Sequence, residues 1–275
     1  MRRLVSLAPL SLNSPGPRDL IDAAVAGGFN AVSLRVRANQ LPAAHALLGN
    51  PTLQRETKQQ LDAVGLSVLA MLSYRAGPEG VEPDLSEAAE LGARLGARFV
   101  VITAWDDNRE RLVENLGRAR ELAAGAGLRL VLEYMVFSAV RNLAAALDVA
   151  HQADVLLLVD ALHMARSGGK PAELATVEQG RIAYSQICDA SARTDLDPLA
   201  EAKNGRCDPG QGELPLVELL RALPPGIALE HEAPDPRLAA LSFDERGRLA
   251  GNAMRDLLKR AMGAQSRNSE SPTRD

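Results

Sequence analysis

Short apolar runs alternate with longer amphipathic segments along almost the whole chain. The runs have the length and composition of buried strands, at 3–8, 30–36, 66–72, 98–105, 128–135, 155–159, 181–187 and 227–232. Segments between them have helical spacing, and we predict helices at 17–28, 52–64, 84–96, 107–124, 138–150, 171–177, 213–222 and 236–262. A glycine separates helix from strand at several junctions, Gly28, Gly65 and Gly96 among them, as is typical of helix ends.

Strands that alternate with helices form a parallel sheet. Eight such units in about 260 residues predict an α/β fold, a (β/α)8 TIM barrel, with residues 1–262 as its single domain. An open doubly wound sheet is the alternative. It is disfavoured because no strand leads into a G-x-G-x-x-G turn and because polar residues end many strands instead of one switch point. The tail, 263–275, is polar and aperiodic, and we expect it to be disordered.

Composition narrows the function classes. The formal net charge of −4 gives no reason to expect a nucleic-acid partner, which needs a clustered basic face. No run approaches the ~18 apolar residues of a membrane helix, so no membrane partner is expected. The two cysteines, Cys188 and Cys207, fit neither a metal motif nor a disulfide framework, which favours the cytoplasm. The oligomeric state stays open, a homo-oligomer included.

Polar residues stand where the later strands end, and they carry the candidate chemistry. They are Glu133, Asp160, Gln186, Glu230 and Glu232. The carboxyl ends of barrel strands meet at one mouth, so these side chains should converge there. Several carboxylates close together repel one another unless a cation lies between them. Carboxylates with an amide oxygen form a hard ligand set, which suits Mn²⁺, Mg²⁺ or Co²⁺ better than Zn²⁺.

Basic residues near these strand ends are candidates for catalysis and substrate binding. His163 follows Asp160 by three residues, so it is either a general acid/base or a histidine that only hydrogen-bonds its loop. Arg35, Arg166 and Arg206 either hold an anionic group of a substrate in bidentate fashion or form surface salt bridges.

The same segments resemble a known group of proteins. They are LEYMVF at 132–137, VDALHMARSGG at 159–169, YSQICDA at 184–190, GRCDPGQGELPL at 205–216 and EHEAP at 230–234. Together they resemble the sugar-phosphate isomerase/epimerase family, the xylose-isomerase-like TIM barrels. The resemblance implies a divalent metal held by Glu133, Asp160, Gln186 and Glu232. It favours Glu232 over Glu230, because the family pattern E-V-P matches Glu232-Ala233-Pro234.

Gln186 departs from the commonest family pattern, which has histidine there. The ligand set Glu, Asp, Gln and Glu resembles the dehydroshikimate dehydratase branch. The segment at 206–212 resembles the family's R-x-x-P-G-x-G, in which Gly210 and Gly212 would let backbone amides approach an anion beside Arg206. Nuclease relatives use several metal-binding histidines, and this chain, with four histidines in all, does not fit them.

These features predict an enzyme of a small anionic or polyhydroxy substrate. The first hypothesis is a divalent-metal-dependent isomerase or epimerase of a small sugar, keto-sugar or sugar acid, which would act through an enediolate. Glu133 and Glu232 would remove and return the proton. The alternative is a metal-dependent lyase similar to 3-dehydroshikimate dehydratase, with His163 as base or acid. A third, different in class, is a non-catalytic barrel that only binds a ligand.

Overall fold

Eight parallel strands pair in the order β2-β1-β9-β8-β7-β6-β5-β3, and a pairing of β2 with β3 closes them into a barrel. This computed structural model describes residues 3–263. The strands are β1 Val5–Leu7, β2 Ala31–Arg35, β3 Ser67–Gly77, β5 Phe99–Ala104, β6 Arg129–Glu133, β7 Leu156–Asp160, β8 Ile182–Ile187 and β9 Ala228–His231. The predicted single-domain (β/α)8 barrel is confirmed.

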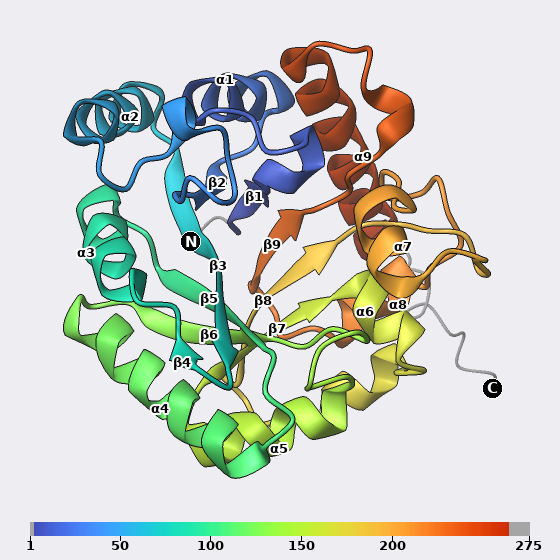
Figure 1. Cartoon of the computed structure of the whole chain (residues 1–275). Coiled ribbons are helices and arrows are strands. Elements are labelled where there is room, and N and C mark those ends of the chain that lie inside the picture. Colours follow the sequence, from blue (N-terminus) through green and yellow to red (C-terminus); the bar gives the residue numbers. More distant parts are fainter. Residues whose placement is uncertain (1–2, 264–275) are drawn as a thin grey trace, which may run out of the picture.

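Helices form a ring around the strands (Figure 1). They are α1 Pro17–Gly27, α2 Pro51–Val64, α3 Leu85–Leu95, α4 Arg109–Gly125, α5 Leu143–Ala153, α6 Ala161–Arg166, α7 Pro198–Asn204, α8 Leu216–Ala222 and α9 Phe243–Gly263. Short 3₁₀ helices lie at η1 Pro9–Leu12, η2 Ala43–His45, η3 Pro171–Thr176 and η4 Pro236–Leu238. Among the helices of residues 3–263, none has the length and apolar character that crossing a bilayer requires.

The structure differs from the sequence prediction mainly in its connections. The predicted strand at 66–72 is longer in the structure, where β3 runs on to Gly77 and forms a hairpin with the antiparallel strand β4 Gly80–Val81. Helices α6 and α7 lie in segments for which the sequence pattern predicts no helix. The last predicted helix starts later, at Phe243. The predicted disordered tail begins at Gly263, the end of α9, and its remainder, 264–275, lies outside the described residues.

The pleat of each strand divides its side chains between two cores. On β6, Leu130 and Leu132 pack outward among the helices, whereas Val131 faces the barrel interior together with Leu158 of β7. Both faces are therefore apolar, which explains the unbroken apolar runs in the sequence. Glu133 continues the inward face of Val131 to the carboxyl end of β6. The barrel thus brings the polar side chains at the carboxyl ends of the strands together at one opening of the barrel.

Candidate metal centre

Three carboxylates converge at the carboxyl ends of neighbouring strands. Glu133 ends β6, Asp160 ends β7 and Glu232 directly follows β9. Each offers an oxygen within 4.8 Å of the other two, and all three side chains are buried. The barrel geometry therefore brings together residues that are up to 99 positions apart in the sequence.

Gln186 on β8 adds a neutral oxygen to this group. Its Nε2 donates to Oε2 of Glu230 at 3.0 Å. Its Oε1 is buried and accepts no hydrogen bond from residues 3–263, although Gln186 lines the same cavity as Glu133 and Glu232. A buried acceptor without a donor is costly, and a cation would satisfy it. Oε1 of Gln186 is therefore suited to be the fourth ligand of a metal ion.

Glu230 and Glu232 lie two residues apart on the same face of the chain but in different surroundings. Oε1 of Glu230 accepts hydrogen bonds from Ser6 at 2.9 Å and from Ser33, and the side chain is fully buried inside the barrel. Glu232 lines the cavity instead. The arrangement agrees with the choice of Glu232 as the ligand.

The electrostatics of the three carboxylates favour a bound cation. Burial, reinforced by Glu232 and Asp160, raises the pKa of Glu133 well above its ordinary value. Burial likewise raises the pKa of Glu232 to about 7. Burial alone would raise the pKa of Asp160, but Nη1 of Arg206 donates to its Oδ2 at 2.6 Å and holds that pKa below its ordinary value.

A divalent cation fits this donor set. Three ionised carboxylates and the charge of Arg206 leave two negative charges, which one divalent ion would neutralise. The donors are carboxylate and amide oxygens, which prefer hard cations.

The centre lies in a cavity of about 240 Å³ with a cationic wall. Arg35, Arg75 and Lys203 line it, and none of them forms an ion pair with another residue of the described chain. Nη1 of Arg35 donates to Ser14 Oγ at 2.8 Å, while its Nε is buried without a partner in residues 3–263. The guanidinium of Arg75 stacks 4.9 Å above the Trp105 ring. This wall is suited to an anionic ligand.

His163 stands at the edge of the same cavity. Its backbone N–H donates to Oδ1 of Asp160 at 2.9 Å, so Asp160 also caps α6. Burial lowers the pKa of His163 to about 4, which leaves the ring neutral at neutral pH. Its Nδ1 has no hydrogen-bond partner within the described chain, and the ring meets Phe137 edge-on at 5.3 Å. Its Nε2 lies 3.5 Å from Nη2 of Arg206, which can only donate, so the proton of the neutral ring is on Nδ1 and is available to a ligand.

Arg206 lines the cavity, but its guanidinium is already bound by other groups of the protein. Besides Asp160, its Nη1 donates to the backbone oxygen of Glu232 at 3.2 Å, and its Nε donates to Ala202 at 3.0 Å. The side chain is buried. The guanidinium of Arg206 therefore holds the carboxylates in place, and the residue also lines the cavity.

Three other predicted substrate-binding residues lie outside the cavity lining. Arg166 binds Glu201 through Nε at 2.8 Å and Nη2 at 2.6 Å, which docks α7 against α6. Gly210 donates its backbone N–H to Asp189 Oδ2 at 2.8 Å. A Cβ at Gly212 would come 2.5 Å from Asp189 Oδ1. This loop therefore surrounds the carboxylate of Asp189, and neither glycine borders the cavity.

Sequence reasoning missed two residues of the cationic wall. Arg75 belongs to the extension of β3, and the predicted strand ended at 72. Lys203 lies on α7, between the predicted strand at 181–187 and the predicted helix at 213–222. No local motif marks either residue, so only the backbone path reveals them.

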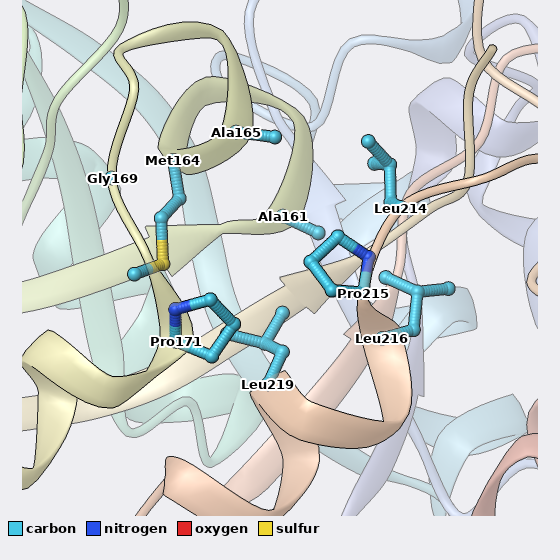
Figure 2. A pocket seen from close by; sticks show the side chains of 9 residues that line it. All are labelled: Ala161, Met164, Ala165, Gly169, Pro171, Leu214, Pro215, Leu216 and Leu219. Carbon is cyan, nitrogen blue, oxygen red and sulfur yellow. The ribbon is translucent and has the colours of Figure 1, made fainter. Parts of the chain in front are cut away.

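A second pocket lies on the other side of α6 (Figure 2). It holds about 20 Å³, room for little more than one water molecule. Its lining is apolar: Ala161, Met164, Ala165, Gly169, Pro171, Leu214, Pro215, Leu216 and Leu219. In Figure 2 the side chain of Met164 descends from α6 towards Pro171, and Leu216 and Leu219 rise from α8. This pocket is a packing gap without polar groups for a ligand.

Comparison with known proteins agrees with the predicted resemblance. The family model described as "Xylose isomerase-like TIM barrel" matches residues 21–259. A curated 3-dehydroshikimate dehydratase from Pseudomonas aeruginosa is 27% identical over 231 residues, which are 78% of this chain. The match spans only 35% of that relative's length.

Solved structures share the barrel at low identity. A xylose isomerase-like TIM barrel/4-hydroxyphenylpyruvate dioxygenase fusion protein is 20% identical, with a TM-score of 0.82 over 99% of this chain and 45% of that one. The IOLI protein with a bound zinc atom is 17% identical, with a TM-score of 0.77 over 94% and 99%. A D-allulose 3-epimerase from Methylomonas sp. is also 17% identical, with a TM-score of 0.69 over 94% and 99%. At these identities the likeness shows the fold alone.

Proposed function

This chain belongs to the xylose isomerase-like TIM barrel family, and from that premise we propose that it is a divalent-metal-dependent lyase. The proposed substrate is a small hydroxy-keto acid of the dehydroshikimate type. The reaction removes one molecule of water: a C–H and a C–O bond break, and a C=C bond forms. Both enzyme hypotheses from the sequence share the same metal centre, so the choice between them depends on the cavity around it.

One observation carries the proposal: the cavity combines an oxygen-rich metal centre with three cations that form no ion pair with a carboxylate of the described chain. A neutral sugar in the cavity would have no charge to pair with the cationic wall of Arg35, Arg75 and Lys203. A substrate carboxylate would complete it. This favours the lyase over the isomerase, and the curated dehydratase relative and the Gln186 pattern support the same order.

The proposed roles follow from the contacts. Glu133, Asp160, Gln186 and Glu232 would hold the metal ion. When bound, a divalent cation supplies Lewis-acid polarisation of a carbonyl. His163 is neutral, and Arg206 can only donate to its Nε2 at 3.5 Å, so the ring proton is on Nδ1 and His163 is the proposed acid for the departing hydroxyl. Glu133, whose pKa is raised by burial, is the proposed base for the proton next to the carbonyl. Arg35 has a buried Nε free to bind the substrate carboxylate.

An isomerase or epimerase remains the second candidate, because two of the carboxylates suit reversible proton transfer. The pKa values of Glu133 and Glu232 are both raised by burial, and their oxygens lie within 4.8 Å of each other. Such a pair could remove a proton from a carbon and return it without loss of a hydroxyl.

The test uses purified protein loaded with Mn²⁺ and offered 3-dehydroshikimate or a neutral keto-sugar such as D-allulose. Loss of water extends conjugation, so the lyase would produce a rise in near-ultraviolet absorbance with the acid and no turnover of the sugar. Epimerised sugar and no absorbance change would contradict the lyase.

The Arg35→Met variant tests the proposed carboxylate contact. A charge-assisted hydrogen bond contributes about 1.5–3 kcal/mol, so KM for the acid should rise about 10- to 100-fold. Arg118→Met, at an exposed position on α4, is the matched control and should leave KM unchanged. An unchanged KM in Arg35→Met would remove this residue from the substrate site.

A further inference from the structure

We propose that Glu230 is a positioning residue that makes the neutral Gln186 a metal ligand, by turning the amide oxygen of Gln186 towards the cavity. The inference rests on the metal centre of the proposed function, and it assigns a role to a buried carboxylate that this function does not use. Its basis is the hydrogen-bond geometry inside the barrel.

A glutamine amide has two ends of almost equal size, and its surroundings decide which end faces a site. If Gln186 turned its NH₂ group to the cavity, it would present donors to a cation and could not ligate it. The carboxylate of Glu230 removes this alternative, because an ionised carboxylate only accepts hydrogen bonds. Nε2 of Gln186 donates to Oε2 of Glu230 at 3.0 Å, which leaves Oε1 as the end that faces the cavity.

Glu230 is itself held from the other side of the barrel. Ser6 of β1 donates to its Oε1 at 2.9 Å, and Ser33 of β2 donates to the same oxygen. Oε2 is thereby left as the acceptor for Gln186. This network joins four neighbouring strands, β2, β1, β9 and β8, beneath one ligand.

The network also explains why Glu230 is distinct from the ligands although it is so close to them. Both of its oxygens already accept hydrogen bonds from side chains of residues 3–263, whereas Oε1 of Gln186 accepts none. Side chains that orient a ligand commonly change metal affinity about 10- to 100-fold when they are altered.

The test is the affinity for Mn²⁺ measured by titration calorimetry, which needs no turnover. Glu230→Gln keeps the size of the side chain but can present a donor to Gln186, so the Kd for Mn²⁺ should rise about 10- to 100-fold. Glu178→Gln is the matched control, because it makes the same substitution at an exposed glutamate outside the network and leaves the contact between Glu230 and Gln186 intact. Its Kd should stay close to that of the wild type.

A double-mutant cycle separates positioning from simple loss of charge. In the Gln186→Ala background, the substitution Glu230→Gln should have little further effect on Mn²⁺ affinity, because the residue through which it acts is absent. Fully additive effects would overturn the positioning role. If Glu230→Gln does not fold, Glu230→Asp, which withdraws the acceptor by one methylene, is expected to change the Kd in the same direction.

The two levels of the proposal fail differently. A wild-type protein that binds no Mn²⁺ would overturn the metal centre and this inference together. If the wild type binds Mn²⁺ and Glu230→Gln binds it with the same Kd, the positioning role alone is overturned and the proposed function stays in place.

Discussion

Helix α6 separates two cavities of opposite character. On one side, His163 faces the polar cavity at the mouth of the barrel, where three carboxylates and an orphaned amide oxygen meet. On the other side, Met164 faces the small apolar pocket beside α8 (Figure 2). Neighbouring residues on a helix point in different directions, so a six-residue helix serves both. The two cavities therefore differ in their polar groups: a buried polar atom without a hydrogen-bond partner, and not a cavity by itself, indicates a functional site.

The largest effect on stability is expected at the polar cavity, in Arg206→Met. The change removes the buried cation that pairs with Asp160 at 2.6 Å and leaves the carboxylates without compensation. Breaking such a buried pair costs about 3–5 kcal/mol. Denaturant unfolding of the metal-free protein measures the loss. If Arg206→Met unfolds at the same midpoint denaturant concentration as the wild type, Arg206 does not stabilise the centre.

At the apolar pocket, Met164→Ala should cost about 2–5 kcal/mol of stability, because it enlarges a gap that the protein cannot refill. Affinity for Mn²⁺ should not change, since no ligand is touched. Met164→Leu, which nearly conserves volume, should cost less than about 1.5 kcal/mol. Weakened Mn²⁺ binding in Met164→Ala, with the fold retained, would show that the two sides of α6 are coupled.

The pH should change the stability of the protein through the polar cavity and not through the apolar pocket. We expect this effect to be smaller than those of the two substitutions above. The folded-state pKa of Glu232 is raised from 4.5 to about 7, so its contribution to stability is present below the ordinary pKa and is lost as the pH rises through about 7. The melting temperature of the metal-free protein should therefore fall between about pH 6.5 and pH 8. At lower pH, His163 acts in the opposite direction, because its pKa is lowered to about 4. Mn²⁺ should abolish this fall, because the cation takes the place of the proton.

Glu232→Gln is the control for that pH dependence. Its amide does not titrate, so the metal-free variant should lose less stability over the same range. Met164→Ala should keep the full wild-type dependence. A wild-type melting temperature that is flat from pH 6.5 to pH 8 without metal would contradict the raised pKa of Glu232.

The barrel and its polar strand ends were predictable from the sequence because both depend on local pattern. Buried strands read as apolar runs, and Glu133, Asp160 and Gln186 stand directly at their ends. The pleat of β9 also placed Glu230 and Glu232 on one face. What separates their roles is the pair of serines, Ser6 and Ser33, which lie more than 190 residues away in the chain.

The substrate-binding residues were harder to predict because arginine and glycine patterns do not reveal their partners. Arg166 pairs with Glu201, 35 residues later, and the amide of Gly210 pairs with Asp189, 21 residues earlier. Conversely, Arg75 and Lys203 reach the cavity through a longer strand and an unexpected helix. Tertiary contacts alone decide which cations remain uncommitted.

The metal content of the purified protein tests the central claim most directly, combined with the melting temperature during a Mn²⁺ titration. The account predicts near-stoichiometric Mn, Mg or Co in the wild type and a melting temperature that rises with Mn²⁺ by mass action. Glu133→Ala should lose both, whereas Glu178→Ala, at an exposed position, should lose neither. A wild-type protein that contains no metal and shows no shift with Mn²⁺ would contradict the metal centre.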